Sequence, residues 1–141
     1  MKINGKTYRS IWLADGRVMI IDQTRLPHEL SIVELKTMKE AAKAIADMWV
    51  RGAPLIGATA AYGMALAMRE EASDSHLAFA AQTLGATRPT AINLLWAINR
   101  VVAALAPLPV SQRAEAAFSL AAHICDEDAE MNRRIGAHGL A

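Results

Sequence analysis

The sequence has few of the features that mark specialised classes of protein. Its 141 residues include one cysteine, Cys125, so an internal disulfide is impossible. Aromatic residues make up only 5% of the chain, which argues against a surface that stacks nucleic-acid bases. Neither sign of charge is in excess, because 15 Lys and Arg face 14 Asp and Glu, for a net charge of +1. Since no global field attracts nucleic acid or an anionic membrane, any anion site must be local.

Long hydrophobic runs are also missing. The first 20 residues carry five charged side chains and so lack the apolar core of a signal peptide. The most apolar stretch, residues 53–68, contains Gly and Tyr and falls short of a membrane span. Hydrophobic residues nevertheless make up 53% of the chain, and many are alanine, the best helix former. We therefore expect a soluble, cytoplasmic protein with one core of tightly packed helices.

The first 36 residues have the chemistry of a small antiparallel sheet. The apolar segments 10–13 and 18–21 flank Asp15-Gly16, a dipeptide typical of hairpin turns. Leu26-Pro27-His28 ends the second of these strands, and residues 31–35 are predicted to form another. We expect about three antiparallel strands in the subregion 1–36.

From residue 37 to residue 141 the apolar period becomes that of helices. Thr37 and Glu40 match a capping box, in which a hydroxyl and a carboxylate satisfy free amides at a helix start. This first helix is predicted to end near Val50, to bury Met48 in its apolar stripe and to be closed by a left-handed Gly52. Further helices are expected over residues 54–69, 76–84, 89–105 and 111–135. The predicted fold class is α+β, mainly α, with the sheet and the helical bundle 37–141 in one domain.

Two loops share one arrangement, an arginine followed closely by a proline that suits the first turn of a helix. They are Arg51-Gly52-Ala53-Pro54 and Thr87-Arg88-Pro89-Thr90. A helix start offers unpaired N–H groups and the positive end of the helix dipole, and arginine adds a fork of donors that matches phosphate oxygens. If both helix starts face one cleft, they form a site for a phosphorylated small molecule. Each loop alone is also compatible with a solvated arginine or with one that pairs with a carboxylate.

The other candidate groups point less clearly to chemistry. Cys125 lies in an alanine-rich helical pattern, so we expect a core side chain and no nucleophilic pair with His123, which faces another side of the helix. The four histidines lack metal-ligand spacing. The acidic run over residues 126–130 is typical of a solvated helix face. Trp12 and Trp96 are expected in the core, with the wall of a pocket as the alternative.

The arginine loops also resemble the motifs of a known family. Residues 50–57, continuing into 60–63, resemble the signature of methylthioribose-1-phosphate isomerases. These enzymes group with the regulatory subunits of translation initiation factor 2B and with ribose-1,5-bisphosphate isomerases. Residues 88–94 resemble the second motif of the family, and residues 22–29 and the hairpin 12–16 resemble its isomerase branch. The resemblance extends over essentially all 141 residues.

This resemblance implies an aldose–ketose isomerase of methionine salvage, which converts 5-methylthioribose 1-phosphate to 5-methylthioribulose 1-phosphate. It places Arg51, Gly52, Ala53 and Arg88 at substrate-contacting positions. It implies homodimers that use no metal and no organic cofactor. It also implies a catalytic cysteine in a Thr-x-Cys-Asn-x-Gly motif and an aspartate, both in a C-terminal Rossmann-like domain. Neither motif occurs in this sequence, so we expect a substrate-binding fragment that is inactive on its own.

Three other functions stay open at this point. A regulatory module, as in the initiation factor 2B subunits, would bind a sugar phosphate or nucleotide and signal to a partner protein. A ribose-1,5-bisphosphate isomerase would recognise phosphate in a similar way and differ in the pocket at carbon five, which this sequence does not display. A helical scaffold would use both arginine loops only structurally. The intact loops and residues 22–29 favour the enzyme.

Overall fold

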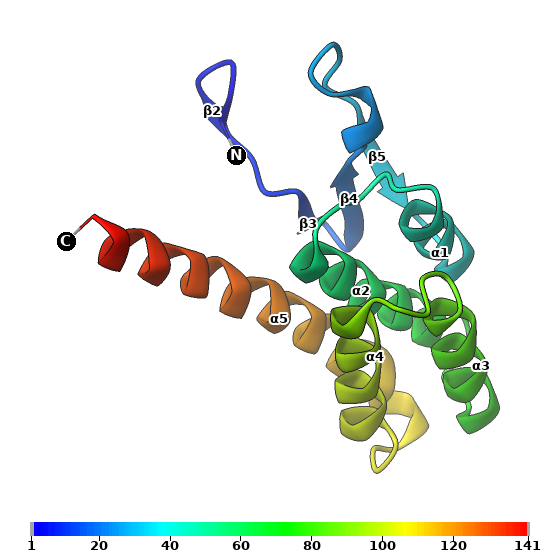
Figure 1. The fold of residues 1–141 in the computed structure, drawn as a ribbon. Helices are drawn as coiled ribbons and strands as arrows, with labels where there is room; N and C mark the ends of the chain where they lie inside the picture. The colour runs from blue at the N-terminus through cyan, green and yellow to red at the C-terminus, as the bar shows by residue number, and fades with distance from the viewer. Residues whose placement is uncertain (1, 141) are drawn as a thin grey trace.

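The computed structural model describes residues 2–140, in which two small antiparallel sheets precede five helices (Figure 1). A ribbon of two strands is followed by a three-stranded sheet in the order β3-β4-β5. The strands are β1 (Lys2–Ile3), β2 (Lys6–Thr7), β3 (Ile11–Ala14), β4 (Arg17–Ile21) and β5 (Ile32–Leu35). The helices are α1 (Met38–Ala46), α2 (Ala53–Glu70), α3 (Asp74–Gly85), α4 (Ile92–Leu105) and α5 (Val110–Gly139). The predicted fold class, α+β and mainly α, is confirmed.

The β3–β4 hairpin follows directly from its turn residues. Ala14 pairs with Arg17, which leaves Asp15 and Gly16 as a two-residue loop with φ of 51° and 75°. Both angles lie in the left-handed region that this type of turn requires. Asn4 and Gly5 form the same kind of turn between β1 and β2, with φ of 50° and 79°. The predicted sheet did not include this second turn, so β1 and β2 are additional to the three predicted strands.

Helix α2 is the axis of the bundle. Every residue from Ile56 to Met68 is buried, and α2 packs against α1, α3, α4, α5 and β3. Small side chains make this close packing possible. A Cβ added to Gly63 would lie 3.0 Å from Leu84 on α3 and 3.1 Å from Ala41 on α1. The close helix contacts expected from the alanine and glycine content are therefore present.

Helix α1 is shorter than predicted and is closed by a different residue. It ends at Ala46, and Met48 adopts the left-handed conformation with φ of 61°. The Trp49 N–H donates to the Ala44 carbonyl at 2.9 Å, as in a Schellman motif. Met48 is 43% exposed and so does not belong to the buried stripe. Gly52, which was predicted to close α1, has φ of 93° and instead forms the N-cap of α2.

Several other helix ends differ from the prediction. Helix α3 starts two residues earlier, at Asp74, because the Ser73 hydroxyl accepts a hydrogen bond from the His76 N–H and caps the helix. Helix α4 starts three residues later, at Ile92, so Pro89 does not lie in its first turn. Helix α5 extends to Gly139. Its outer half projects away from the bundle (Figure 1). None of the helices within residues 2–140 combines the length and hydropathy needed to cross a bilayer.

Candidate functional site

Helix α2 starts with free N–H groups beside an arginine. Its N-cap, Gly52, provides no side-chain hydrogen bond, and Pro54 in the first turn has no N–H of its own. Arg51 is exposed, and its Nε donates to the Met48 carbonyl at 3.4 Å. Within residues 2–140 the two Nη atoms of Arg51 have no hydrogen bond or ion pair. This end of α2 therefore offers unused donors and the positive end of a helix dipole.

Helix α4 starts in a similar way, although not at its proline. The segment from Arg88 to Ala91 is a turn, closed by a 2.9 Å hydrogen bond from the Ala91 N–H to the Arg88 carbonyl. Ala91 is the N-cap and has no side chain that caps the helix. Arg88 is half-buried, and no other part of residues 2–140 forms a hydrogen bond or ion pair with its guanidinium. The first turn of α4 is thus also uncapped.

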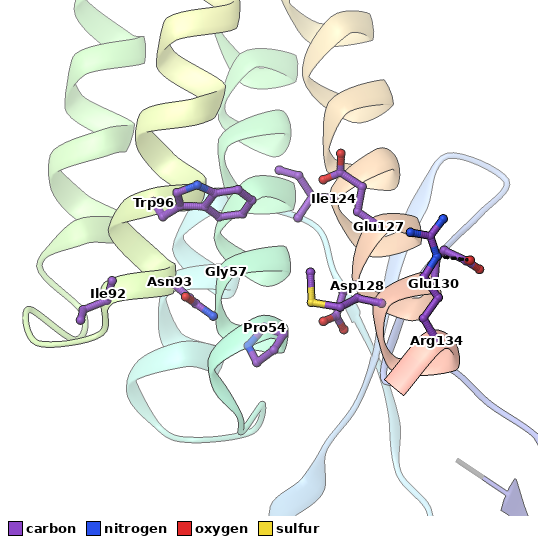
Figure 2. Close-up of a pocket in the computed structure, with 11 residues that line it drawn as sticks. Pro54, Gly57, Ile92, Asn93, Trp96, Ile124, Glu127, Asp128, Glu130 and Arg134 are labelled. Carbon is purple, nitrogen blue, oxygen red and sulfur yellow. Dashed lines mark hydrogen bonds and ion pairs between the residues drawn. The ribbon is translucent and has the colours of Figure 1, made fainter. Parts of the chain in front are cut away.

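The first turns of α2 and α4 lie against one another. A Cβ added to Gly57, one turn into α2, would lie 3.0 Å from the carbonyl oxygen of Asn93, the second residue of α4. Pro54 and Gly57 on α2 line the same groove as Ile92 and Asn93 on α4 (Figure 2). The volume of this groove is about 760 Å³, and its third wall comes from α5.

The four predicted site residues lie beside this groove and not in its lining. Arg51, Gly52 and Ala53 lead directly into Pro54, and Arg88 lies in the turn that precedes Ile92. The structure therefore brings the two helix starts together at one groove. Contact of both guanidiniums with the same ligand stays a prediction.

The α5 wall of the groove is acidic, but most of its charge is neutralised. Hydrogen bonds from Arg100, at 2.6 and 3.1 Å, hold the pKa of Glu127 below its usual range. Hydrogen bonds from two arginines farther along α5 do the same for the pKa of Glu130. Asp128 accepts a 3.3 Å hydrogen bond from Asn132 but has no cationic partner within residues 2–140.

Asp128 is the group that opposes an anion at this site. It lines a second, smaller pocket of about 140 Å³ together with Pro54, so it lies close to the start of α2. Figure 2 shows it on the α5 wall across from Pro54. A phosphate at the start of α2 would compete with this carboxylate for the positive end of the helix dipole.

An apolar wall lies farther along the groove. Trp96 on α4 is 51% exposed, and it lines the groove together with Ile124 and Met131 of α5. The expectation that Trp96 lies in the core is therefore wrong, and the alternative of a pocket wall is the correct one. Trp12 is half-buried in β3, where its ring lies 6.5 Å from that of Tyr8.

The third wall of the groove, from α5, was not predicted, because the sequence of the outer half of α5 is typical of a solvated helix face followed by a tail. The signal that was available is a stripe with helical spacing. Ala117, Ala121 and Ile124 are buried in the bundle, and Met131 and Ile135 continue the same stripe beyond it with exposures of 60% and 63%.

Cys125 is not a nucleophile of this site. Its half-buried side chain packs against the core, and burial raises the pKa of the thiol to about 11. The thiol is therefore protonated at neutral pH. His123 lies 2.9 Å from a Glu127 carboxylate oxygen and pairs with that group. Within residues 2–140 no three His, Cys, Asp or Glu side chains are grouped as metal ligands.

The fold and these motifs place the chain in a family. The model of the Initiation factor 2 subunit family matches residues 49–141, and the chain belongs to that family. It is 64% identical over 143 residues to the methylthioribose-1-phosphate isomerase of Paramagnetospirillum magneticum and 66% identical over 140 residues to that of Cereibacter sphaeroides. These alignments cover 100% and 99% of this chain but 40% and 38% of the relatives. The chain thus spans about two fifths of the length of these curated relatives.

Solved structures show the same relationship. The 5-methylthioribose 1-phosphate isomerase from Pyrococcus horikoshii superimposes with a TM-score of 0.86 at 36% identity, over 95% of this chain and 40% of that one. The translation initiation factor eIF-2B subunit delta from A. fulgidus superimposes with a TM-score of 0.81 at 41% identity, over 88% of this chain and 38% of that one. The family resemblance inferred from the two arginine motifs is confirmed. The fold itself is shared by proteins with either name.

Proposed function

We propose that this chain is the N-terminal, substrate-binding part of an aldose–ketose isomerase that converts 5-methylthioribose 1-phosphate to 5-methylthioribulose 1-phosphate. The observation that carries the proposal is the pair of uncapped helix starts at one groove, each preceded by an arginine whose terminal nitrogens have no partner within residues 2–140. The names of the relatives that match the whole chain at 64–66% identity supply the substrate.

In this proposal the phosphate binds at the start of α2 and is shared with the start of α4. Gly52, which has no Cβ, allows an oxygen to approach the backbone, and the N–H of Ala53 lies at the positive end of the helix dipole. Arg51 and Arg88 add planar sets of donors that match phosphate oxygens. No residue of this chain is assigned to the proton transfers of the isomerisation.

The proposal assigns the chemistry to protein beyond these 141 residues. We place the catalytic cysteine and aspartate in a C-terminal Rossmann-like domain, and we take the active form to be a homodimer without metal or organic cofactor. The length of the curated relatives supports a second domain, because this chain covers only about 40% of them. We also place the protein in the cytoplasm, where an unpaired cysteine such as Cys125 stays reduced.

A regulatory role is the second candidate function. It is favoured by one observation, the likeness to the eIF-2B subunit delta structure at 41% identity. A regulatory protein would use the same groove to sense a sugar phosphate and would carry out no turnover.

A chimera separates the two functions. In it, these 141 residues replace the matched 40% of the Paramagnetospirillum magneticum relative. We expect isomerase turnover from the chimera and none from the 141-residue chain alone, as followed by ³¹P NMR. In the chimera, Arg51→Ala should raise KM at least about tenfold, because charge-assisted hydrogen bonds to the phosphate are lost.

Arg17→Ala is the matched control, because Arg17 is an exposed arginine in the β3–β4 hairpin. Turnover by the isolated chain would contradict the proposed division between the two domains. An Arg51→Ala chimera with the KM of the Arg17→Ala control would remove the phosphate role of the α2 start. A chimera that binds the substrate without turnover would favour the regulatory function.

A further inference from the structure

We infer that the wall formed by Trp96 and Ile124 receives the methylthio group at carbon five of the substrate and thereby excludes a second phosphate. This inference rests on the proposed function, because it takes the phosphate on carbon one to bind at the helix starts. The two arginine motifs do not decide which sugar phosphate binds. We place that choice in residues that lie outside both motifs.

The position of the wall matches the shape of the substrate. Trp96 lies four residues after Ile92, the first residue of α4, and so about 6 Å along the helix axis from its start. That distance is comparable to the length of a five-carbon chain with bonds of about 1.5 Å. Figure 2 shows the Trp96 ring beside the groove at the level of Ile124, with Pro54 at the other end and Asn93 between Trp96 and Pro54. A phosphate at the helix starts therefore directs carbon five toward the wall.

The chemistry of the wall suits a thioether. Trp96 is 51% exposed and lines the groove together with Ile124, so it presents apolar surface that a ligand can cover. A sulfur atom packs favourably against an aromatic ring, and the terminal methyl group gains from leaving water.

The same wall is unfavourable for a phosphate. The guanidinium of Arg100 lies 5.4 Å from the centre of the Trp96 ring, but both of its Nη atoms already bind Glu127. Arg134 lines the groove, and its Nε lies 2.9 Å from Glu130. Arg134 lies ten residues beyond Ile124 on α5 and so away from the wall. At the wall itself, a phosphate on carbon five would have to displace Glu127 from its ion pair with Arg100. Ribose 1,5-bisphosphate is for this reason the poorer ligand.

Titration calorimetry on the 141-residue chain tests the wall with three ligands: 5-methylthioribose 1-phosphate, ribose 1-phosphate and ribose 1,5-bisphosphate. We expect the methylthio compound to bind at least about tenfold more tightly than ribose 1-phosphate, as an apolar pocket allows. Trp96→Ala should bring this ratio close to one. Leu95→Ala, at the neighbouring position of α4 with 41% exposure, is the control and should preserve the ratio.

A second variant tests the exclusion of phosphate. Glu127→Gln weakens the hold on Arg100, so the affinity for ribose 1,5-bisphosphate relative to the methylthio compound should rise several-fold. Asp47→Asn removes an exposed partner of Lys43 on α1, away from the groove, and should leave that ratio as it is. Circular dichroism confirms that each variant is folded.

The outcomes separate the inference from the proposed function. Equal affinity of the wild-type chain for the methylthio compound and ribose 1-phosphate, with both lost in Arg51→Ala, overturns the wall and leaves the phosphate site intact. An unchanged ratio in Trp96→Ala also overturns the wall. Failure of the folded chain to bind any of the three ligands overturns the wall and the proposed function together.

Discussion

Arg113 is 3% exposed, and its guanidinium donates hydrogen bonds to four carbonyl oxygens that end helices or lie in loops. Three of these carbonyls follow or end α4, and the fourth, of Ala72, precedes α3. The guanidinium also lies 2.6 Å from a carboxylate oxygen of Asp74. One buried side chain thus satisfies groups that the end of a helix leaves without partners and joins α5 to the connections on either side of α3 and α4.

Replacement of Arg113 by methionine should lower the free energy of unfolding by about 3–5 kcal/mol, because buried carbonyls lose their donors. Asp74→Asn should cost less than about 1 kcal/mol, because the Asp74 side chain is 88% exposed. Urea unfolding followed by circular dichroism measures both changes. Equal losses for the two variants would show that the exposed ion pair, and not the buried hydrogen bonds, carries the stability.

At the scale of single residues, the sequence predicts the environment of Cys125 but not the role of Arg113 or the exposure of Trp96. The core position of Cys125 follows from the alanine-rich pattern around it, and the structure places its thiol against the core. The role of Arg113 has no local signal, because its acceptors lie between 5 and 41 residues away along the chain. Trp96 was placed in the core because large aromatic side chains are usually buried, and a groove wall is the exception that binding sites provide.

At the scale of elements, the location of the site is set by the starts of helices α2 and α4. The β3–β4 turn is predictable because Asp15-Gly16 requires left-handed angles that few dipeptides adopt. The start of α4 is less predictable, because Arg88, as the residue before a proline, disfavours the helical conformation. The sequence Arg88-Pro89 is therefore compatible both with a helix that starts at Pro89 and with a separate turn that precedes the helix, and the structure has the separate turn. Met48 likewise closes α1, a role that the sequence analysis assigned to Gly52.

Two helical glycines provide a matched test of the α2–α4 contact. A Cβ on Gly57 would lie 3.0 Å from a backbone carbonyl of α4, whereas a Cβ on Gly136 of α5 would meet no atom within 4 Å. Gly136→Ala should stabilise the protein by up to about 1 kcal/mol, which is the difference in helix propensity. Gly57→Ala should be at least about 1 kcal/mol less stable than Gly136→Ala, because the packed backbone must shift.

Thermal unfolding of the two alanine variants gives the comparison. Equal stability of Gly57→Ala and Gly136→Ala would mean that α4 moves away from α2 at little cost. The first turns of the two helices would then not be held together at the groove.

At the scale of the whole molecule, the fold is a central helix, α2, surrounded by four others and preceded by two small sheets. The change of apolar period at residue 37 was enough to predict this class. The groove was not predictable, because its lining comes from segments as far apart as Pro54 and Arg134. The two motifs identified the family, and the structure adds that both motifs lead into the same groove.

In the proposed site, the starts of α2 and α4 bind one phosphate group together. A double-mutant cycle of Arg51→Ala and Arg88→Ala, with ribose 1-phosphate binding measured by titration calorimetry, tests it most directly. If both arginines contact the same phosphate, each single variant loses at least about tenfold in affinity, and the double variant loses clearly less than the product of the two losses. Losses below about twofold for either arginine, or losses that multiply as independent contributions, would contradict the shared site.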